Sequence, residues 1–78
     1  MFERITIHPN VLHGEPCIRG LRIPVHLVVG LVAAGMTTSE IIQEYPDLEL
    51  EDIRAALDYA AYVTREQVIP IEALGAPA

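Results

Sequence analysis

Two arginines, Arg19 and Arg22, are the residues whose type and spacing most strongly suggest contact with a partner. The chain has only five basic residues, all of them arginine, and these two lie close together in the segment GEPCIRGLRIPV, residues 14–25. A guanidinium presents a planar fork of donors that matches a carboxylate. Glycines and prolines at short intervals restrict the backbone of this segment. The pattern indicates two cations on a constrained turn.

Residue types that perform catalysis do not form a recognisable pattern. The spacings of His8, His13 and His26 match no standard zinc motif. Cys17 is the single cysteine, so no internal disulfide can form, and we interpret it as a small hydrophobic residue in a strand. Ser39 lies in a helix-capping segment rather than in a nucleophile turn. We expect no catalytic residue, no metal site and no cofactor, and therefore a protein that is not an enzyme.

Length and composition predict one small domain that needs a partner. Residues 1–78 can build one core, yet 51% of the residues are hydrophobic. Small scaffolds often gain stability by oligomerisation. We expect a homodimer, with an apolar monomer as the alternative. No secretory signal is apparent, and the apolar run 25–34 is too short to cross a bilayer, so we expect a cytoplasmic protein without a membrane partner.

The charge is acidic and unevenly distributed. The formal net charge is −6. Residues 1–39 hold three arginines against two glutamates, a net +1, whereas residues 40–78 hold two arginines against nine acids, a net −7. An acidic chain lacks the electrostatic attraction that dominates non-specific DNA binding. DNA binding by the protein alone should therefore be weak.

Short β-strands are expected within residues 1–23. Residues 4–7 alternate polar and apolar, which predicts a strand with Ile5 and Ile7 facing inward. Further strands are expected at residues 17–19 and 21–23. A sheet of such short strands needs a helix to cover it.

Three helices are expected within residues 24–67. The first, 25–34, follows Pro24 and is apolar on nearly every face, which is typical of a buried helix. The second begins at a capping box, Thr37 with Glu40, and stops before Pro46. The third should run over 50–67, followed by an extended tail over 68–78.

The third helix carries a predicted core stripe and a predicted interaction rim. The stripe is Ile53, Ala56, Leu57 and Ala60, and the solvent face is Glu51, Arg54, Asp58 and Arg65. Glu51 and Asp52 lie in the first turn, where negative charge suits the helix dipole. Tyr59 and Tyr62 widen the apolar arc, so we expect them at a subunit or partner contact.

The elements together predict an α+β, mostly α, fold in which a small N-terminal sheet precedes a unit of three helices. The second and third helices could form a helix-turn-helix, with the first helix packed behind them. A DNA-reading third helix should begin with Arg, Lys, Asn or Gln. Here residues 50–55 read LEDIRA, whose carboxylates would repel phosphate. The topology can be shared with DNA-binding proteins without their function.

Several motifs across residues 4–67 resemble the bacterial and archaeal "domain of unknown function" family numbered 433. They are G-x-P-x-I-x-G-x-R-I-x-V from Gly14, G-M-x-x-x-E-I from Gly35, Y-P-x-L from Tyr45 and D-I-x-x-A-L-x-Y-A from Asp52. The resemblance implies a small sheet before a homeodomain-like unit and an antitoxin-like protein, often paired with a PIN-type ribonuclease. Leu21 and Glu49 stand where the family usually has threonine. The first removes a hydroxyl from the turn, and the second weakens a helix cap.

The leading hypothesis is a non-catalytic antitoxin of a type II toxin–antitoxin pair that binds a PIN-like ribonuclease, with partner contacts at Arg19, Arg22, Tyr59 and Tyr62. Arg22 could instead pair internally with an acid of the C-terminal half. Arg19 is expected to serve the partner, so that Arg19→Ala weakens binding without lowering the melting temperature. The alternatives are a helix-turn-helix DNA-binding autoregulator and an oligomeric scaffold without a toxin.

Overall fold

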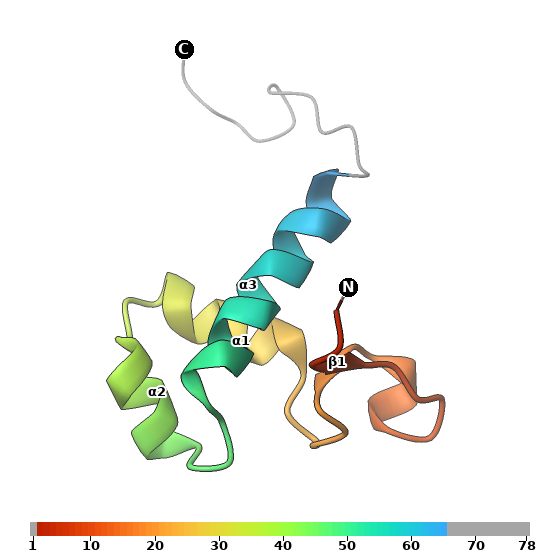
Figure 1. The fold of residues 1–78 in the computed structure, drawn as a ribbon, viewed down its shortest axis with the longest axis horizontal. Coiled ribbons are helices and arrows are strands. Elements are labelled where there is room, and N and C mark those ends of the chain that lie inside the picture. Colours follow the sequence, from red (N-terminus) through yellow and green to blue (C-terminus); the bar gives the residue numbers. More distant parts are fainter. Residues whose placement is uncertain (1, 66–78) are drawn as a thin grey trace.

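The computed structural model describes residues 2–65, which form three helices and two short strands (Figure 1). The chain runs through β1 (Ile5–Thr6), a 3-10 turn (Leu12–Gly14), β2 (Cys17–Ile18), α1 (Val25–Ala33), α2 (Thr38–Glu44) and α3 (Leu50–Arg65). This arrangement confirms the predicted mostly helical α+β fold with an N-terminal sheet. Within residues 2–65, no helix has the length and apolarity that a bilayer span requires. The expected tail over 68–78 lies outside the described residues.

The N-terminal sheet is one antiparallel pair. Ile5 lies opposite Ile18, and Thr6 lies opposite Cys17. Cys17 and Ile18 are both buried, as expected for the second strand. The prediction for Ile7 is wrong, because its side chain is 59% exposed after β1 has ended at Thr6.

The third strand predicted at 21–23 does not form. Arg19 and Gly20 both adopt left-handed φ angles, +42° and +73°, and turn the chain back on itself. The return segment makes a single antiparallel bridge between Cys17 and Pro24. Proline has no N–H to extend such a ladder, so the pairing stops there and α1 begins.

Helix α1 is less buried than its apolar sequence predicts. It ends at Ala33, with Gly35 at φ +97° just beyond, as expected for a left-handed C-cap. Only Val25 and Val28 are fully buried. Positions 26, 30 and 33 are exposed, because α3 and α2 cover one side of the helix and leave the other open.

Helix α2 begins at the predicted capping box. The Thr37 hydroxyl accepts a hydrogen bond from the Glu40 N–H at 3.1 Å, and the Glu40 carboxylate accepts one from the Thr37 N–H at 2.8 Å. These bonds lower the pKa of Glu40. Because both partners lie within one turn of each other, the short-range sequence pattern was sufficient to locate this helix.

Helix α3 crosses α1 and projects beyond the rest of the described residues (Figure 1). Ile53 and Ala56 are buried, as predicted, but Leu57 is 38% exposed, so its assignment to the core stripe is wrong. The buried stripe runs instead through Asp52, Ile53 and Ala56, with Tyr59 packed at its edge. The core joins all three helices and β2: Ile18, Val25, Val28, Ile41, Leu48, Ile53 and Ala56.

Candidate functional site

A fully buried carboxylate, Asp52, joins the N-terminal sheet to the start of α3. Its side chain is 0% exposed. Oδ1 accepts hydrogen bonds from Arg19 Nε at 2.9 Å and Arg4 Nη1 at 2.8 Å. Oδ2 accepts hydrogen bonds from Arg19 Nη2 and the Glu49 N–H, each at 2.8 Å. A carboxylate offers about four lone-pair sites, so these four donors satisfy Asp52 completely.

Arg19 is held at two points by α3 and the turn before it. Besides its forked contact with Asp52, its Nη2 donates to the Asp47 carbonyl at 2.7 Å. Its φ of +42° is uncommon for a residue other than glycine. Such conformations persist where surrounding contacts over-determine them. Arg19 therefore serves the fold, contrary to the expectation that folding does not account for it.

Arg4 completes the cluster and gives Glu49 a role. The Arg4 Nη1 contacts Glu49 Oε1 at 2.9 Å as well as Asp52. Hydrogen bonds with these acids raise the pKa of Arg4, and the bond to Asp52 raises the pKa of Arg19. Burial would raise the pKa of Asp52, but the donors from Arg19, Glu49 and Arg4 together hold that pKa at about 2. The side chains of Asp52, Arg4 and Arg19 therefore remain charged at neutral pH.

The role of Asp52 was missed in the sequence because its arginine partners lie 33 and 48 residues away. Charge in a first helical turn suits the dipole, and this local explanation appeared sufficient. One signal was present. Asp52 precedes Ala56 by four residues and Tyr59 by seven, so it falls on the apolar stripe of the helix. A carboxylate on such a stripe requires a cation.

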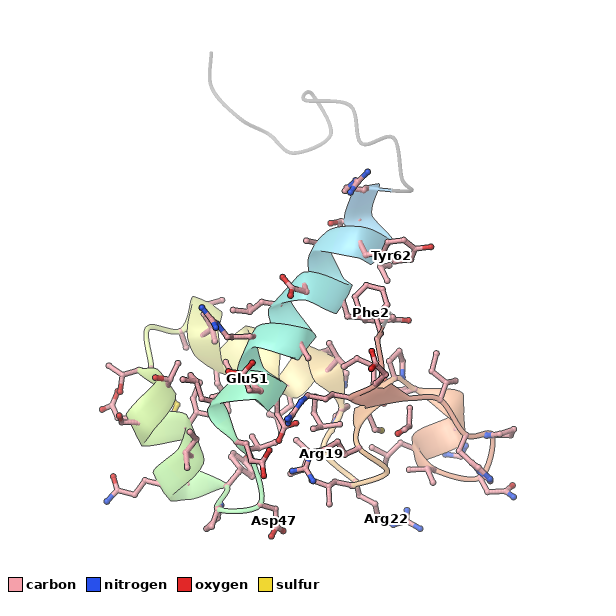
Figure 2. The ribbon with its side chains drawn as sticks, in the orientation of Figure 1. Phe2, Arg19, Arg22, Asp47, Glu51 and Tyr62 are labelled. Atoms are coloured by element: carbon pink, nitrogen blue, oxygen red, sulfur yellow. The ribbon has the colours of Figure 1, made fainter. Side chains whose placement is uncertain are left out.

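Arg22 differs from Arg4 and Arg19 in its exposure and in its partners. It is exposed, and within residues 2–65 no carboxylate forms an ion pair with it, so the expected internal pairing is not observed. Figure 2 shows Arg22 at the outer edge of its turn, whereas Arg19 lies near the first turn of α3. The internal ion pair that was the alternative for Arg22 is thus made by Arg19 instead.

We expect Arg19→Ala to lower the melting temperature by several degrees, because it removes two of the four donors to a buried carboxylate. Arg22→Ala, which changes an exposed side chain, should leave the melting temperature unchanged. Circular dichroism melts of both variants under identical conditions measure the contrast. Equal melting temperatures for the two variants would contradict the assigned roles.

A small pocket adjoins Arg22. Its other lining residues are Pro9, Asn10, Leu12 and His13. Leu12 and His13 hold left-handed φ angles of +49° and +58°, which are uncommon for residues with a side chain. Strained backbone of this kind is frequent at ligand-binding segments. The pocket therefore combines a guanidinium, an imidazole and an amide around a fixed loop.

Tyr59 and Tyr62 lie together on α3 and contact the N-terminal segment. The ring of Phe2 packs edge-on against Tyr59, with centroids 5.3 Å apart, and tilted against Tyr62 at 5.2 Å. Tyr62 is nevertheless 42% exposed, and Figure 2 shows it near the end of the helix. Tyr59 is half-buried at the edge of the core. Of the two, Tyr62 is the residue available to a partner.

An open groove follows the outer face of α3 beside residues 2–4. Its apolar lining contains Ala55, Leu57, Ala61 and Tyr62. Its charged lining from the same helix contains Glu51, Arg54, Asp58 and Arg65. We call this surface the α3 groove. It holds all four residues predicted for the solvent face and one of the two predicted contact tyrosines.

The histidines and the cysteine do not combine into a reactive site. His26 approaches the carboxylate of Glu15 at 3.4 Å, with both side chains largely exposed. The Cys17 thiol is buried, and burial raises its pKa, so it is a poor nucleophile. Among residues 2–65, no group of three or more His, Cys, Asp or Glu side chains is placed to hold a metal ion.

Residues 5–60 match the family described as protein of unknown function DUF433. The chain belongs to the DUF433 family. The predicted family resemblance is thereby confirmed. This DUF433 chain is 41% identical over 58 residues to the uncharacterized protein y4eO of Sinorhizobium fredii, a match that covers 74% of this chain and 26% of the relative. The chain thus spans about a quarter of the length of the curated relative it matches.

A solved DUF433 structure supports the fold. The crystal structure of a DUF433 member protein from Anabaena variabilis is similar to this chain with a TM-score of 0.75 and 34% sequence identity. The likeness covers 82% of this chain and 63% of that one. Two residues that depart from the family pattern have clear contacts here. Leu21 packs against the core, and Glu49 pairs with Arg4.

Proposed function

We propose that this DUF433 chain is a non-catalytic binding protein, the antitoxin component of a type II toxin–antitoxin pair that neutralises a PIN-like ribonuclease. One observation supports this most strongly. Arg22 is exposed without a carboxylate partner in residues 2–65, while Arg4 and Arg19 of the same N-terminal half are held by Asp52. Two of the three arginines in the N-terminal half are thus held by ion pairs within the chain. The third, Arg22, is available to another molecule.

The chemistry of Arg22 suits the proposed partner. PIN-type nucleases hold magnesium with clustered carboxylates, and a guanidinium binds a carboxylate through two parallel hydrogen bonds. The pocket beside Arg22 adds the side chains of Asn10 and His13 as further polar contacts. Two short, constrained segments, the loop with Leu12 and His13 and the turn after Arg19, present these groups with little loss of conformational freedom on binding. Arg22 is therefore the residue that we assign to the nuclease carboxylates.

A DNA-binding autoregulator is less well supported. The start of α3 presents the exposed carboxylates of Glu49 and Glu51 where a reading helix would approach phosphate. The nearby guanidiniums of Arg4 and Arg19 are paired with acids rather than available to DNA. An oligomeric scaffold without a toxin accounts equally well for an apolar surface, but it gives Arg22 no role.

The proposal predicts that a gene next to this chain's own encodes a PIN-like protein, and the test is co-expression of the two proteins. The unsubstituted chain should co-purify with that nuclease and restore growth that the nuclease inhibits. Arg22→Glu should abolish both effects, because it places a carboxylate against the carboxylates of the nuclease. Gln43→Glu, which adds a negative charge at an exposed position of α2 outside both pockets, should retain both.

Three results would overturn the proposal: the absence of a PIN-like neighbour, a nuclease that does not bind the chain, or full neutralisation by Arg22→Glu. A strongly salt-dependent shift of promoter DNA by the chain alone would favour the autoregulator instead.

A further inference from the structure

We propose that the α3 groove is a self-complementary surface that receives α3 of a second copy of this chain in antiparallel orientation. The inference does not depend on the antitoxin function, because it uses residues remote from the Arg22 pocket. It rests on the order of charges along α3, on the small residues between them, and on the exposure of the last turns of the helix.

The charges at the two ends of the groove are opposite in sign. Glu51 lies in the first turn of α3 and Arg65 in the last, and both line the groove and are exposed. A parallel pair of helices would place each residue against its own copy and so oppose like charges. An antiparallel pair places Glu51 of each copy opposite Arg65 of the other. Antiparallel docking is therefore the orientation that the charges favour.

Both end charges are available for this contact. Among residues 2–65, Glu51 forms an ion pair with Arg54, at 3.8 Å, which is beyond hydrogen-bond distance. Within residues 2–65, no carboxylate forms an ion pair with Arg65. Pairing across the two chains would thus replace the weak contact of Glu51 with Arg54 and give Arg65 a carboxylate partner. Each dimer contains two such pairings.

Two alanines line the groove half-way along the helix, on either side of Asp58. In the register that opposes residues 51 and 65, Ala55 of one copy lies at the same level as Ala61 of the other, and Asp58 lies at the two-fold axis. Alanines allow two helices to approach closely, and the exposed side chains of Leu57 and Tyr62, 38% and 42% exposed, supply apolar area at the edges. An isologous interface requires such self-complementarity of one patch.

The shape of the molecule leaves room for the second helix. The last turns of α3 project beyond α1, α2 and the sheet (Figure 1). Positions 61, 62, 64 and 65 are exposed there, although the helix continues regularly to Arg65. Isolated helical ends are marginal in water without packing. A partner helix lying along the groove would cover this segment.

The test is a charge exchange between the two ends. Glu51→Arg and Arg65→Glu should each weaken dimerisation roughly tenfold or more, because each opposes like charges at two places in the dimer. The double variant E51R/R65E should dimerise as the unsubstituted chain does. An equimolar mixture of the two single variants should form a heterodimer, since both contacts are then between opposite charges. Sedimentation velocity over a dilution series measures these four samples and the unsubstituted chain.

Three further measurements make the test decisive. Glu44→Arg, an exposed acid on α2 outside the groove, changes net charge by the same amount and should leave dimerisation intact. Asp58→Asn should tighten the dimer, because it removes like charges from the axis. Circular dichroism melts should show every variant folded. A monomeric unsubstituted chain, single variants that dimerise normally, or a mixture that stays monomeric would each overturn the proposal.

Discussion

Asp52→Ala should lower the free energy of unfolding by about 3 kcal/mol, at the lower end of the range for breaking a buried ion pair. The value is at the lower end because the two arginines left behind, Arg4 and Arg19, are each about one-third exposed and can regain water. For a domain of this size the loss corresponds to a fall in melting temperature of more than about 10 °C.

Asp52→Asn and Asp47→Asn serve as comparisons for this prediction. Asn at position 52 preserves the side-chain shape but not the charge, so it should lose about 2 kcal/mol. Asp47 contacts Arg19 through its backbone carbonyl only, and its exposed side chain should tolerate the change within about 0.5 kcal/mol. Urea unfolding of all four chains measures these differences. Equal stability of the Asp52→Asn variant and the unsubstituted chain would show that the cluster does not hold the fold together.

Acid should destabilise the protein through the same residue. The pKa of Asp52 is about 2 in the folded chain, against 3.8 for an ordinary aspartate. Because the folded pKa is the lower one, the contribution to stability is fully present above about pH 5 and is lost as the pH falls through 3.8 towards 2. The difference in pKa corresponds to roughly 2 kcal/mol at neutral pH.

The acid effect can be assigned by measuring the free energy of unfolding from pH 7 to pH 2 in two chains. The unsubstituted chain should lose stability below pH 5, and Asp52→Asn should show a shallower loss. Some loss should remain in the variant, because the capping box lowers the pKa of Glu40 and acts in the same direction. Parallel curves for the two chains would exclude Asp52 as the titrating group.

Sequence reasoning located the elements better than the contacts between them. The capping box at Thr37 and the breaks at Gly35 and Pro46 depend on neighbours within a few residues, and the helices lie where these signals predict. The prediction of a third strand at 21–23 was wrong, because a short apolar run does not reveal the left-handed turn at Arg19. Short-range patterns therefore identified the helices but not the path of the chain between β2 and α1.

The candidate site was harder to predict because charge alone does not reveal a partner. Arg19 and Arg22 look equivalent in the sequence, since both lie on one glycine-rich turn. Their difference arises from the position of Asp52 after α3 has packed on the sheet. The strained loop at Leu12 and His13, which forms one wall of the Arg22 pocket, had no sequence signal at all.

The long separation of Asp52 from Arg4 and Arg19 has a consequence for how the chain folds. The two arginines precede Asp52 by 48 and 33 residues, so closing the cluster requires large loops to form first. During synthesis the strands leave the ribosome well before Asp52 does. Until α3 is synthesised, the left-handed backbone at Arg19 lacks the contact with Asp52 that holds it in place. The N-terminal sheet, β1 and β2, should therefore be the last part of the domain to become protected from hydrogen exchange, although it is the first to be synthesised.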